Sequence, residues 1–189
     1  MKPERLAAFT DGVIAIIITI MVLELPTPRG TDLAAVKPIL PLFGAYLLAF
    51  INVGIFWSNH HHMLQAAKRV DGRVLWANNA LLFCLSLVPF LFRWIGEEGF
   101  HPLPVAAYGL TMIGSAITYV LLERALVAAD GEESKVGAAV GSRHKEWISL
   151  AGYASAAGLA YVSPYIAVAI YVAVAATWLV PDRRFEFWR

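Results

Sequence analysis

The polar side chains that could do chemistry in this 189-residue chain are few, and several lie inside apolar stretches. Asp11 and Thr10 stand in an otherwise apolar run from Leu6 to Leu25, which Thr19 and Glu24 alone interrupt further. A carboxylate buried in such a run is costly unless it is hydrogen-bonded, so we expect Asp11 to face protein or water rather than lipid.

Three consecutive histidines, His60, His61 and His62, suggest a metal site at first sight. Adjacent residues of a helix diverge by about 100°, so the three rings cannot converge on one ion. The i, i+4 spacing of zinc-binding histidines is absent. We therefore expect no metal here, and the alternative role for these rings is a proton-sensitive one near neutral pH. Ser58 and the histidines form no catalytic set either, so the chain is not expected to be an enzyme.

Composition indicates a membrane protein. Hydrophobic residues make up 59% of the chain and the mean hydropathy is +0.62. Charged residues make up 15%, against about 25% in soluble proteins. The net charge of +1 predicts no nucleic-acid partner, and the single cysteine, Cys84, excludes an intrachain disulfide.

The apolar segments predict an all-α integral membrane protein, a single domain of six transmembrane helices. Twenty helical residues span about 30 Å, the thickness of the hydrocarbon core. The expected spans are about 6–25, 36–63, 74–94, 103–122, 147–162 and 165–180, with a polar loop over Glu123–Glu146. The first segment has the length of a signal peptide, but Asp11 lies within it and no small-residue cleavage site follows, so we expect it to remain as the first helix.

Lysine and arginine predict the orientation. Twelve of the 15 fall on the side of the N-terminus in the six-span arrangement: Lys2, Arg5, Lys68, Arg69, Arg73, Arg124, Lys135, Arg143, Lys145, Arg183, Arg184 and Arg189. Only Arg29, Lys37 and Arg93 fall on the other side. The positive-inside rule therefore predicts a multi-pass protein of the cell membrane with both termini in the cytoplasm.

The first helix carries an apolar stripe. At about 100° per residue, Phe9, Ile16, Ile20 and Leu23 fall on one side, with Thr19 at its edge and Asp11 opposite. Arg5 projects about 120° away from Asp11 on an ideal helix, so the two are not expected to pair with each other. Taken alone, the stripe is typical of lipid contact or helix packing.

A motif on this helix changes that interpretation. Arg5-x-x-x-Phe9-Thr10-Asp11 resembles the R-x-x-x-F-S-D signature of the transmembrane protein 175 family of potassium channels, with Thr10 in place of serine. Trp57-x-x-His60-His61 and the asparagines that follow are also similar to that family. The resemblance covers essentially the whole chain.

The resemblance implies a potassium-permeable cation channel that conducts passively. It implies that the first helix of each subunit lines a central pore, with Ile16 at the constriction, Thr19 facing the pore, and Ile20 and Leu23 as the next rings outward. Rings of branched apolar side chains can close a pore by dewetting, which makes a hydrophobic gate. Short members with one six-span unit resemble tetramers, so the partners expected are identical copies in a homotetramer, the lipid bilayer and monovalent cations. Potassium is the permeant ion, and no other cofactor is expected.

The remaining signature residues are interpreted as scaffold. Arg5, Phe9, Thr10 and Asp11 are expected to position the helix rather than to bind ions. The expected packing partners lie in the next two segments: Trp57, Asn59, His60, His61 and Asn78. Our hypothesis is that either His60 or His61, together with an asparagine, holds Thr10 and Asp11.

Two interpretations stay open from the residues. Glu24, at the outer end of the first helix, either concentrates cations at the mouth of the pore or is a solvated helix-end residue. A secondary transporter of cations or protons is the alternative function. Such proteins have repeats and charges at mid-membrane, whereas no span here has a charge at its centre.

Overall fold

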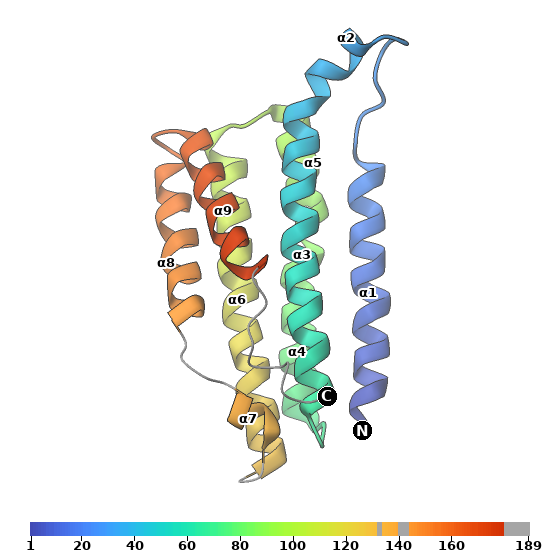
Figure 1. Ribbon diagram of the computed structural model, residues 1–189, viewed down its shortest axis with the longest axis vertical. Helices are drawn as coiled ribbons and strands as arrows, with labels where there is room; N and C mark the ends of the chain where they lie inside the picture. The colour runs from blue at the N-terminus through green and yellow to red at the C-terminus, as the bar shows by residue number, and fades with distance from the viewer. Residues whose placement is uncertain (132–133, 140–143, 180–189) are drawn as a thin grey trace.

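Long helices run side by side along one axis (Figure 1). The computed structural model describes residues 1–131, 134–139 and 144–179, and all regular structure in these ranges is helical. The helices begin with α1 (Pro3–Leu23), and continue with α3 (Leu40–Ala66), α4 (Gly72–Ser86), α5 (Val88–Glu98) and α6 (Pro102–Asp130). The all-α class predicted from the sequence is confirmed.

Four helical stretches of the described chain are long and apolar enough to cross a membrane. They are Pro3–Leu23, Leu33–Ala66, Gly72–Glu98 and Pro102–Asp130. The expectation of a multi-pass membrane protein is thereby confirmed. The final pair, α8 (His144–Leu159) and α9 (Pro164–Leu179), has 16 residues per helix, or about 24 Å, less than a full hydrocarbon core. A fifth and a sixth crossing therefore stay a prediction.

Two of the segments end differently from their predicted bounds. The predicted span over 74–94 is divided at Leu87, because Pro89 in the first turn of α5 has no N–H for the preceding turn. The loop predicted from Glu123 onward is wrong as far as Asp130, because α6 continues through it to a glycine with positive φ, Gly131. Leu122, Glu123 and Leu126 are buried there at helical spacing, so packing maintains the helix through polar sequence. A short helix, α7 (Lys135–Ala139), follows.

The α1–α3 connection extends beyond the other helix ends. It contains α2 (Leu33–Val36) and the 3₁₀ turn η1 (Lys37–Ile39), which stand above the bundle in Figure 1. Asp32 caps α2 by accepting a hydrogen bond from the Ala35 N–H at 3.1 Å. This end of the molecule is called the upper end below, and the end that holds Met1 the lower end.

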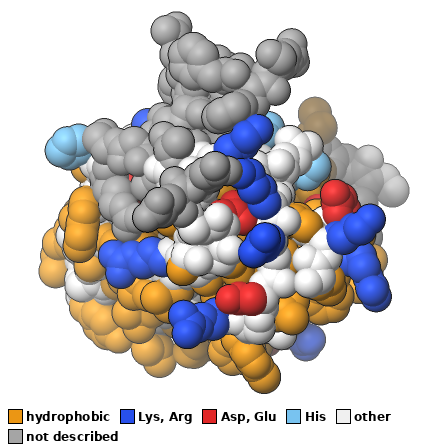
Figure 2. Space-filling model, turned by 90° about the horizontal axis from the view of Figure 1, so that it is seen from below, with side chains coloured by type: hydrophobic (Ala, Val, Ile, Leu, Met, Phe, Trp, Pro, Cys, Tyr) orange, Lys and Arg blue, Asp and Glu red, His pale blue; other side chains and the backbone are white. Residues whose placement is uncertain are grey.

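Basic residues gather at the lower end. Seen from below, several lysine and arginine side chains stand out from the described surface, among hydrophobic side chains and backbone (Figure 2). By their place in the chain, Lys2, Arg5, Lys68, Arg69, Arg73, Arg124, Lys135 and Lys145 belong to this end, and Arg29, Lys37 and Arg93 to the upper end. Arg143, Arg183, Arg184 and Arg189 of the predicted set lie outside the described residues.

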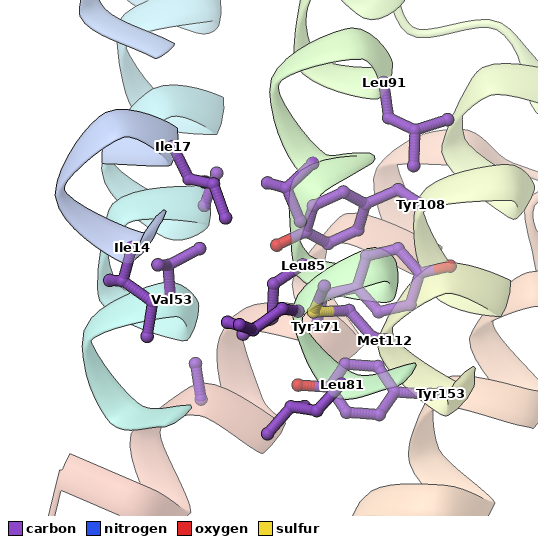
Figure 3. Close-up of a cluster of buried hydrophobic side chains, with 14 of the residues drawn as sticks. Ile14, Ile17, Val53, Leu81, Leu85, Leu91, Tyr108, Met112, Tyr153 and Tyr171 are labelled. Carbon is purple, nitrogen blue, oxygen red and sulfur yellow. The ribbon is translucent and has the colours of Figure 1, made fainter. Parts of the chain in front are cut away.

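A buried polar network joins α8 and α9 to the rest of the bundle. Asn52 of α3 donates to the Tyr108 hydroxyl of α6 at 2.9 Å and accepts from the Tyr153 hydroxyl of α8 at 3.1 Å. Tyr171 of α9 donates to the Val105 carbonyl at 3.1 Å, and its ring lies 5.5 Å from that of Tyr108, centroid to centroid. Figure 3 shows these tyrosines among the apolar core side chains. Because a buried polar group without a partner is costly, this network specifies where the α8–α9 hairpin packs.

The ring of Tyr171 packs so closely against Gly109 of α6 that no side chain fits at that position. A Cβ built on Gly109 would overlap the Tyr171 hydroxyl and lie 2.9 Å from its Cζ. We expect Gly109→Ala to lower the free energy of unfolding by about 1–3 kcal/mol, since a rigid buried ring would have to move. Thermal unfolding in detergent measures this. Gly54→Ala on α3 is the control, because a Cβ there meets nothing within 4 Å and should leave stability unchanged or higher. Equal melting temperatures for the two variants would contradict the prediction.

Candidate pore-lining site

The first helix is packed on one side only. Its buried residues have at most 3% of their surface exposed and share one face: Leu6, Thr10, Ile14, Ile17 and Met21. In Figure 3, Ile14 and Ile17 point from α1 toward the interior of the bundle, where Val53 and Leu85 lie. Helix α1 lies at the edge of the bundle beside α3 (Figure 1), so its other side meets no described part of this chain.

The opposite side carries the predicted stripe. Ile16 is 59% exposed, Ile20 40% and Leu23 81%, and Thr19 is also exposed. Large apolar side chains at this exposure require cover from lipid or from another protein surface. The Thr19 hydroxyl donates to the Ile16 carbonyl at 2.9 Å within the helix, and its oxygen stays available as an acceptor.

A buried cluster holds α1 against α3 and α4. Asn78 Nδ2 donates to Thr10 Oγ1 at 3.1 Å, and Asn78 Oδ1 lies 2.7 Å from His60 Nε2. Because an amide oxygen only accepts, His60 donates through Nε2. All three side chains are at most 1% exposed. His60 and Asn78, a histidine and an asparagine of the predicted set, are therefore hydrogen-bonded to each other, and Asn78 is bonded to Thr10 of the signature.

Asp11 has a different partner from the one hypothesised. Trp57 Nε1 donates to Asp11 Oδ1 at 2.8 Å, and the Trp57 ring stacks on His61 with centroids 5.7 Å apart. His61 in turn is 2.8 Å from the Gln65 amide nitrogen. The hypothesis that a histidine hydrogen-bonds Asp11 is thus corrected. On α3, positions 57 and 61 are about 40° apart, whereas His60 projects about 60° from Trp57 and about 100° from His61, and it contacts Asn78.

Three further signature or partner residues lie away from these contacts. Phe9 is 55% exposed and lies on the same side of α1 as Ile16 and Ile20, not among the buried residues. Arg5 is exposed at the lower end. Asn59 lines a pocket on another side of α3, together with Asn52 and Tyr153. The scaffold role expected for Phe9 and the packing role expected for Asn59 therefore stay predictions.

Glu24, at the upper end of α1, lies beside an arginine. Arg93 Nε of α5 is 2.8 Å from Glu97 Oε1 and 3.7 Å from Glu24 Oε2. Sequence reasoning treated Arg93 only as one of the few upper-end cations. The i, i+4 spacing of Arg93 and Glu97 could have indicated that pair, but the contact with Glu24 depends on the packing of α1 against α5.

The histidine cluster offers no metal site within the described residues. No group of three histidine, cysteine, aspartate or glutamate side chains there lies close enough together to hold an ion.

Comparisons with known proteins place this geometry in a family. The sequence model of the family described as "Endosomal/lysosomal potassium channel TMEM175" matches residues 5–89, the range that holds α1 and its partners on α3 and α4. A potassium channel of Chryseobacterium sp. is 50% identical over 186 residues, which are 98% of this chain and 97% of that protein. The chain belongs to the TMEM175 family.

Two other members extend the comparison. A crystal structure of a TMEM175 homolog from Chamaesiphon minutus, described as a lysosomal potassium-selective channel, has a TM-score of 0.75 and 23% identity, and covers 94% of this chain and 96% of that one. It shows that the fold is shared. The Homo sapiens protein, described as an endosomal/lysosomal proton channel, is 28% identical over 105 residues, or 49% of this chain and 21% of the human protein. TMEM175 is a family of ion channels, which is not a class of enzymes.

The buried cluster predicts different roles for two adjacent asparagines of the TMEM175 chain. Asn78→Leu removes both partners at once, leaving the Thr10 hydroxyl and the His60 N–H buried without hydrogen bonds. We expect the free energy of unfolding to fall by about 2–4 kcal/mol. Asn79→Leu is the matched control, because Asn79 is exposed and should tolerate the change. Thermal unfolding in detergent compares the two, and a loss of the same size for both would argue against the cluster as the anchor of α1.

Proposed function

We propose that this chain forms a potassium-permeable cation channel whose pore is lined by the exposed side of α1. The observation that carries the proposal is the one-sided packing of α1, which leaves Ile16, Thr19, Ile20 and Leu23 uncovered on an edge helix. Membership of a channel family and the potassium channels among its relatives support the choice of ion.

A single copy cannot enclose a passage with one helix. Identical copies brought together around an axis would place four α1 helices at the centre of a homotetramer, each turning its stripe inward. The same assembly covers the exposed apolar side chains, which have no cover within the described chain.

The proposed gate is hydrophobic. Rings formed by Ile16, Ile20 and Leu23 would narrow the passage, and a narrow apolar ring closes to ions by excluding water. Thr19 adds an acceptor oxygen between these rings, the only hydroxyl of this stripe at mid-depth. Opening then requires widening of the rings, with no separate plug.

The proposed orientation has the lower end in the cytoplasm. Eight of the 11 described lysines and arginines belong to that end by their place in the chain, and the positive-inside rule expects such an excess on the cytoplasmic side. Both termini would be cytoplasmic in the cell membrane if α8 and α9 each cross it, which gives six crossings.

The gate is tested by potassium efflux from vesicles that contain the purified protein. Ile16→Asn should raise the flux at least about tenfold, because a polar ring stays hydrated where an apolar ring does not. Ile117→Asn is the matched control, since Ile117 is a 48% exposed isoleucine in the middle of α6 and should leave the flux at the wild-type level.

Three results would overturn the proposal. One is equal flux for wild-type protein, Ile16→Asn and Ile117→Asn. Another is a wild-type flux that saturates and needs a second solute, as in a carrier. A third is proton flux without potassium flux.

The Glu24–Arg93 contact makes a separate prediction about the outer mouth. Arg93→Gln removes the cation beside Glu24, so the carboxylates of the assembled mouth should attract more potassium, and conductance at low salt should rise about twofold or more. The gain should vanish at about 1 M salt, where the Debye length is only about 3 Å. Conductance of single channels in planar bilayers measures this.

Two controls accompany that variant. Arg29→Gln removes another upper-end cation that has no contact with Glu24 among the described residues, and should change conductance less. In Glu24→Gln protein, the further change Arg93→Gln should have little effect. An equal gain with and without Glu24 would show that this carboxylate is a solvated helix-end residue.

A further inference from the structure

The helical segment that precedes α3 projects beyond the part of the bundle that can lie in lipid tails. Helix α2 and the turn η1 continue into α3 without a break, and the 34 residues of Leu33–Ala66 reach about 51 Å as a straight helix. This length exceeds the hydrocarbon core by about 20 Å. In Figure 1, α2 stands above the upper ends of α1 and α3. No residue of α2 or η1 is buried by the part of the chain that the structure describes.

Charged side chains at the upper end indicate where the hydrocarbon core ends. Helix α1 has 21 residues, or about 31 Å, which is enough to cross that core. Glu24 directly follows α1 and lies 3.7 Å from Arg93. Helix α2 lies beyond this level, so lipid tails do not cover its apolar side chains. Leu33 is nevertheless 85% exposed and Val36 39%, and large apolar side chains at such exposure require another protein surface.

The exposed apolar residues continue from α2 into α3 at the spacing of helix–helix packing. They follow one another at intervals of three and four residues, and we call them the heptad seam: Leu33, Val36, Leu40, Phe43, Leu47 and Phe50. Each is at least 39% exposed. On an ideal helix the four that belong to α3 lie within about 80° of one another, whereas Ala49 and Asn52 on the other side are buried. An apolar repeat of 3.5 residues is the pattern by which one helix packs against another, and contact with lipid requires no such spacing.

The neighbouring pore helix indicates which protein covers the seam. Residues 24–32 alone separate α1 from α2, and Leu23 at the end of α1 is 81% exposed. Copies that meet around α1 therefore also come together beside α2. A closed ring of copies joins one face of each chain to a different face of the next, so the seam need not meet itself.

We propose that the heptad seam packs against a second copy of this chain. Its upper part, formed by Leu33, Val36 and Leu40, makes an apolar contact between copies above the membrane, around the outer mouth. This inference rests on the proposed assembly of identical copies and names a surface that holds them together. The contact keeps the upper ends of neighbouring α1 helices at a fixed separation, outside the span that carries the proposed gate.

Dissociation of oligomers in detergent tests the contact by native mass spectrometry of the purified full chain. Leu33→Glu and Leu40→Glu should each raise the protein concentration at which oligomers dissociate by at least about tenfold, because a carboxylate would be buried between copies without a partner. Two upper-end residues outside the seam give matched controls. Val162 is 78% exposed, against 85% for Leu33, and Leu103 is 54% exposed, against 56% for Leu40.

The control variants Val162→Glu and Leu103→Glu should dissociate within about twofold of the wild-type concentration. Equal shifts in the seam and control variants would overturn the proposal, as would unchanged dissociation in all four. A wild-type chain that forms no oligomer would overturn it together with the proposed assembly.

Hydrogen exchange of the wild-type protein makes the same test without a substitution. The backbone amides of residues 34–37 should exchange at least about tenfold more slowly in the oligomer than in protein diluted to monomers in the same detergent. Those of residues 160–163, between α8 and α9, should exchange equally in both. Slow exchange of residues 34–37 in both states would show that the segment lies on the detergent or membrane surface, and would overturn the contact between copies.

Potassium flux separates this inference from the proposed function. With both correct, Leu33→Glu should lower the flux together with the fraction of oligomer, and Val162→Glu should change neither. Oligomers weakened by Leu33→Glu alone, in a protein that gives no potassium flux, would overturn the pore and leave the contact. Normal wild-type flux with oligomers unaffected by Leu33→Glu would overturn the contact and leave the pore.

Discussion

The position of the first helix depends on a buried hydrogen-bonded cluster of Thr10, Asn78 and His60. Two apolar helices gain little from association in a bilayer, because lipid tails are as apolar as leucine. Polar side chains inside the bundle are different, since none of them can be separated from its partner without losing a hydrogen bond in a nonpolar surrounding. The cluster therefore determines which side of α1 is buried, and so which side is left exposed.

Different parts of α1 are held by different kinds of contact. Near its lower end the helix is held twice, through Thr10 inside the bundle and through Asp11 and Trp57 at its margin. From Ile14 upward its buried side chains, in the part of the chain that the structure describes, are apolar, and at the upper end Glu24 lies 3.7 Å from Arg93. In the proposed channel, this middle stretch would carry the apolar constriction, and a change in its width would break few hydrogen bonds.

Buried polar side chains also position the α8–α9 hairpin. The α8–α9 hairpin is too short to be positioned by hydropathy alone, and the Asn52–Tyr108–Tyr153 network connects it to α3 and α6. Charged side chains, unlike these buried neutral polar groups, lie mostly at the helix ends, where water solvates them. Eight of the 11 described lysines and arginines belong to the lower end by their place in the chain.

The sequence by itself determined the all-helical membrane class, the apolar stripe of α1 and the family, because hydropathy and a local motif are properties of consecutive residues. It also indicated that a histidine and an asparagine support the signature. Tertiary structure decided which polar atom meets which: His60 and Asn78 hold Thr10, Trp57 holds Asp11, and Arg93 approaches Glu24. It also extended α6 through polar residues to Asp130, whose carboxylate caps the backbone of a turn 61 and 62 positions earlier. These contacts depend on the rotation and depth of one helix against another, and packing between distant segments sets both.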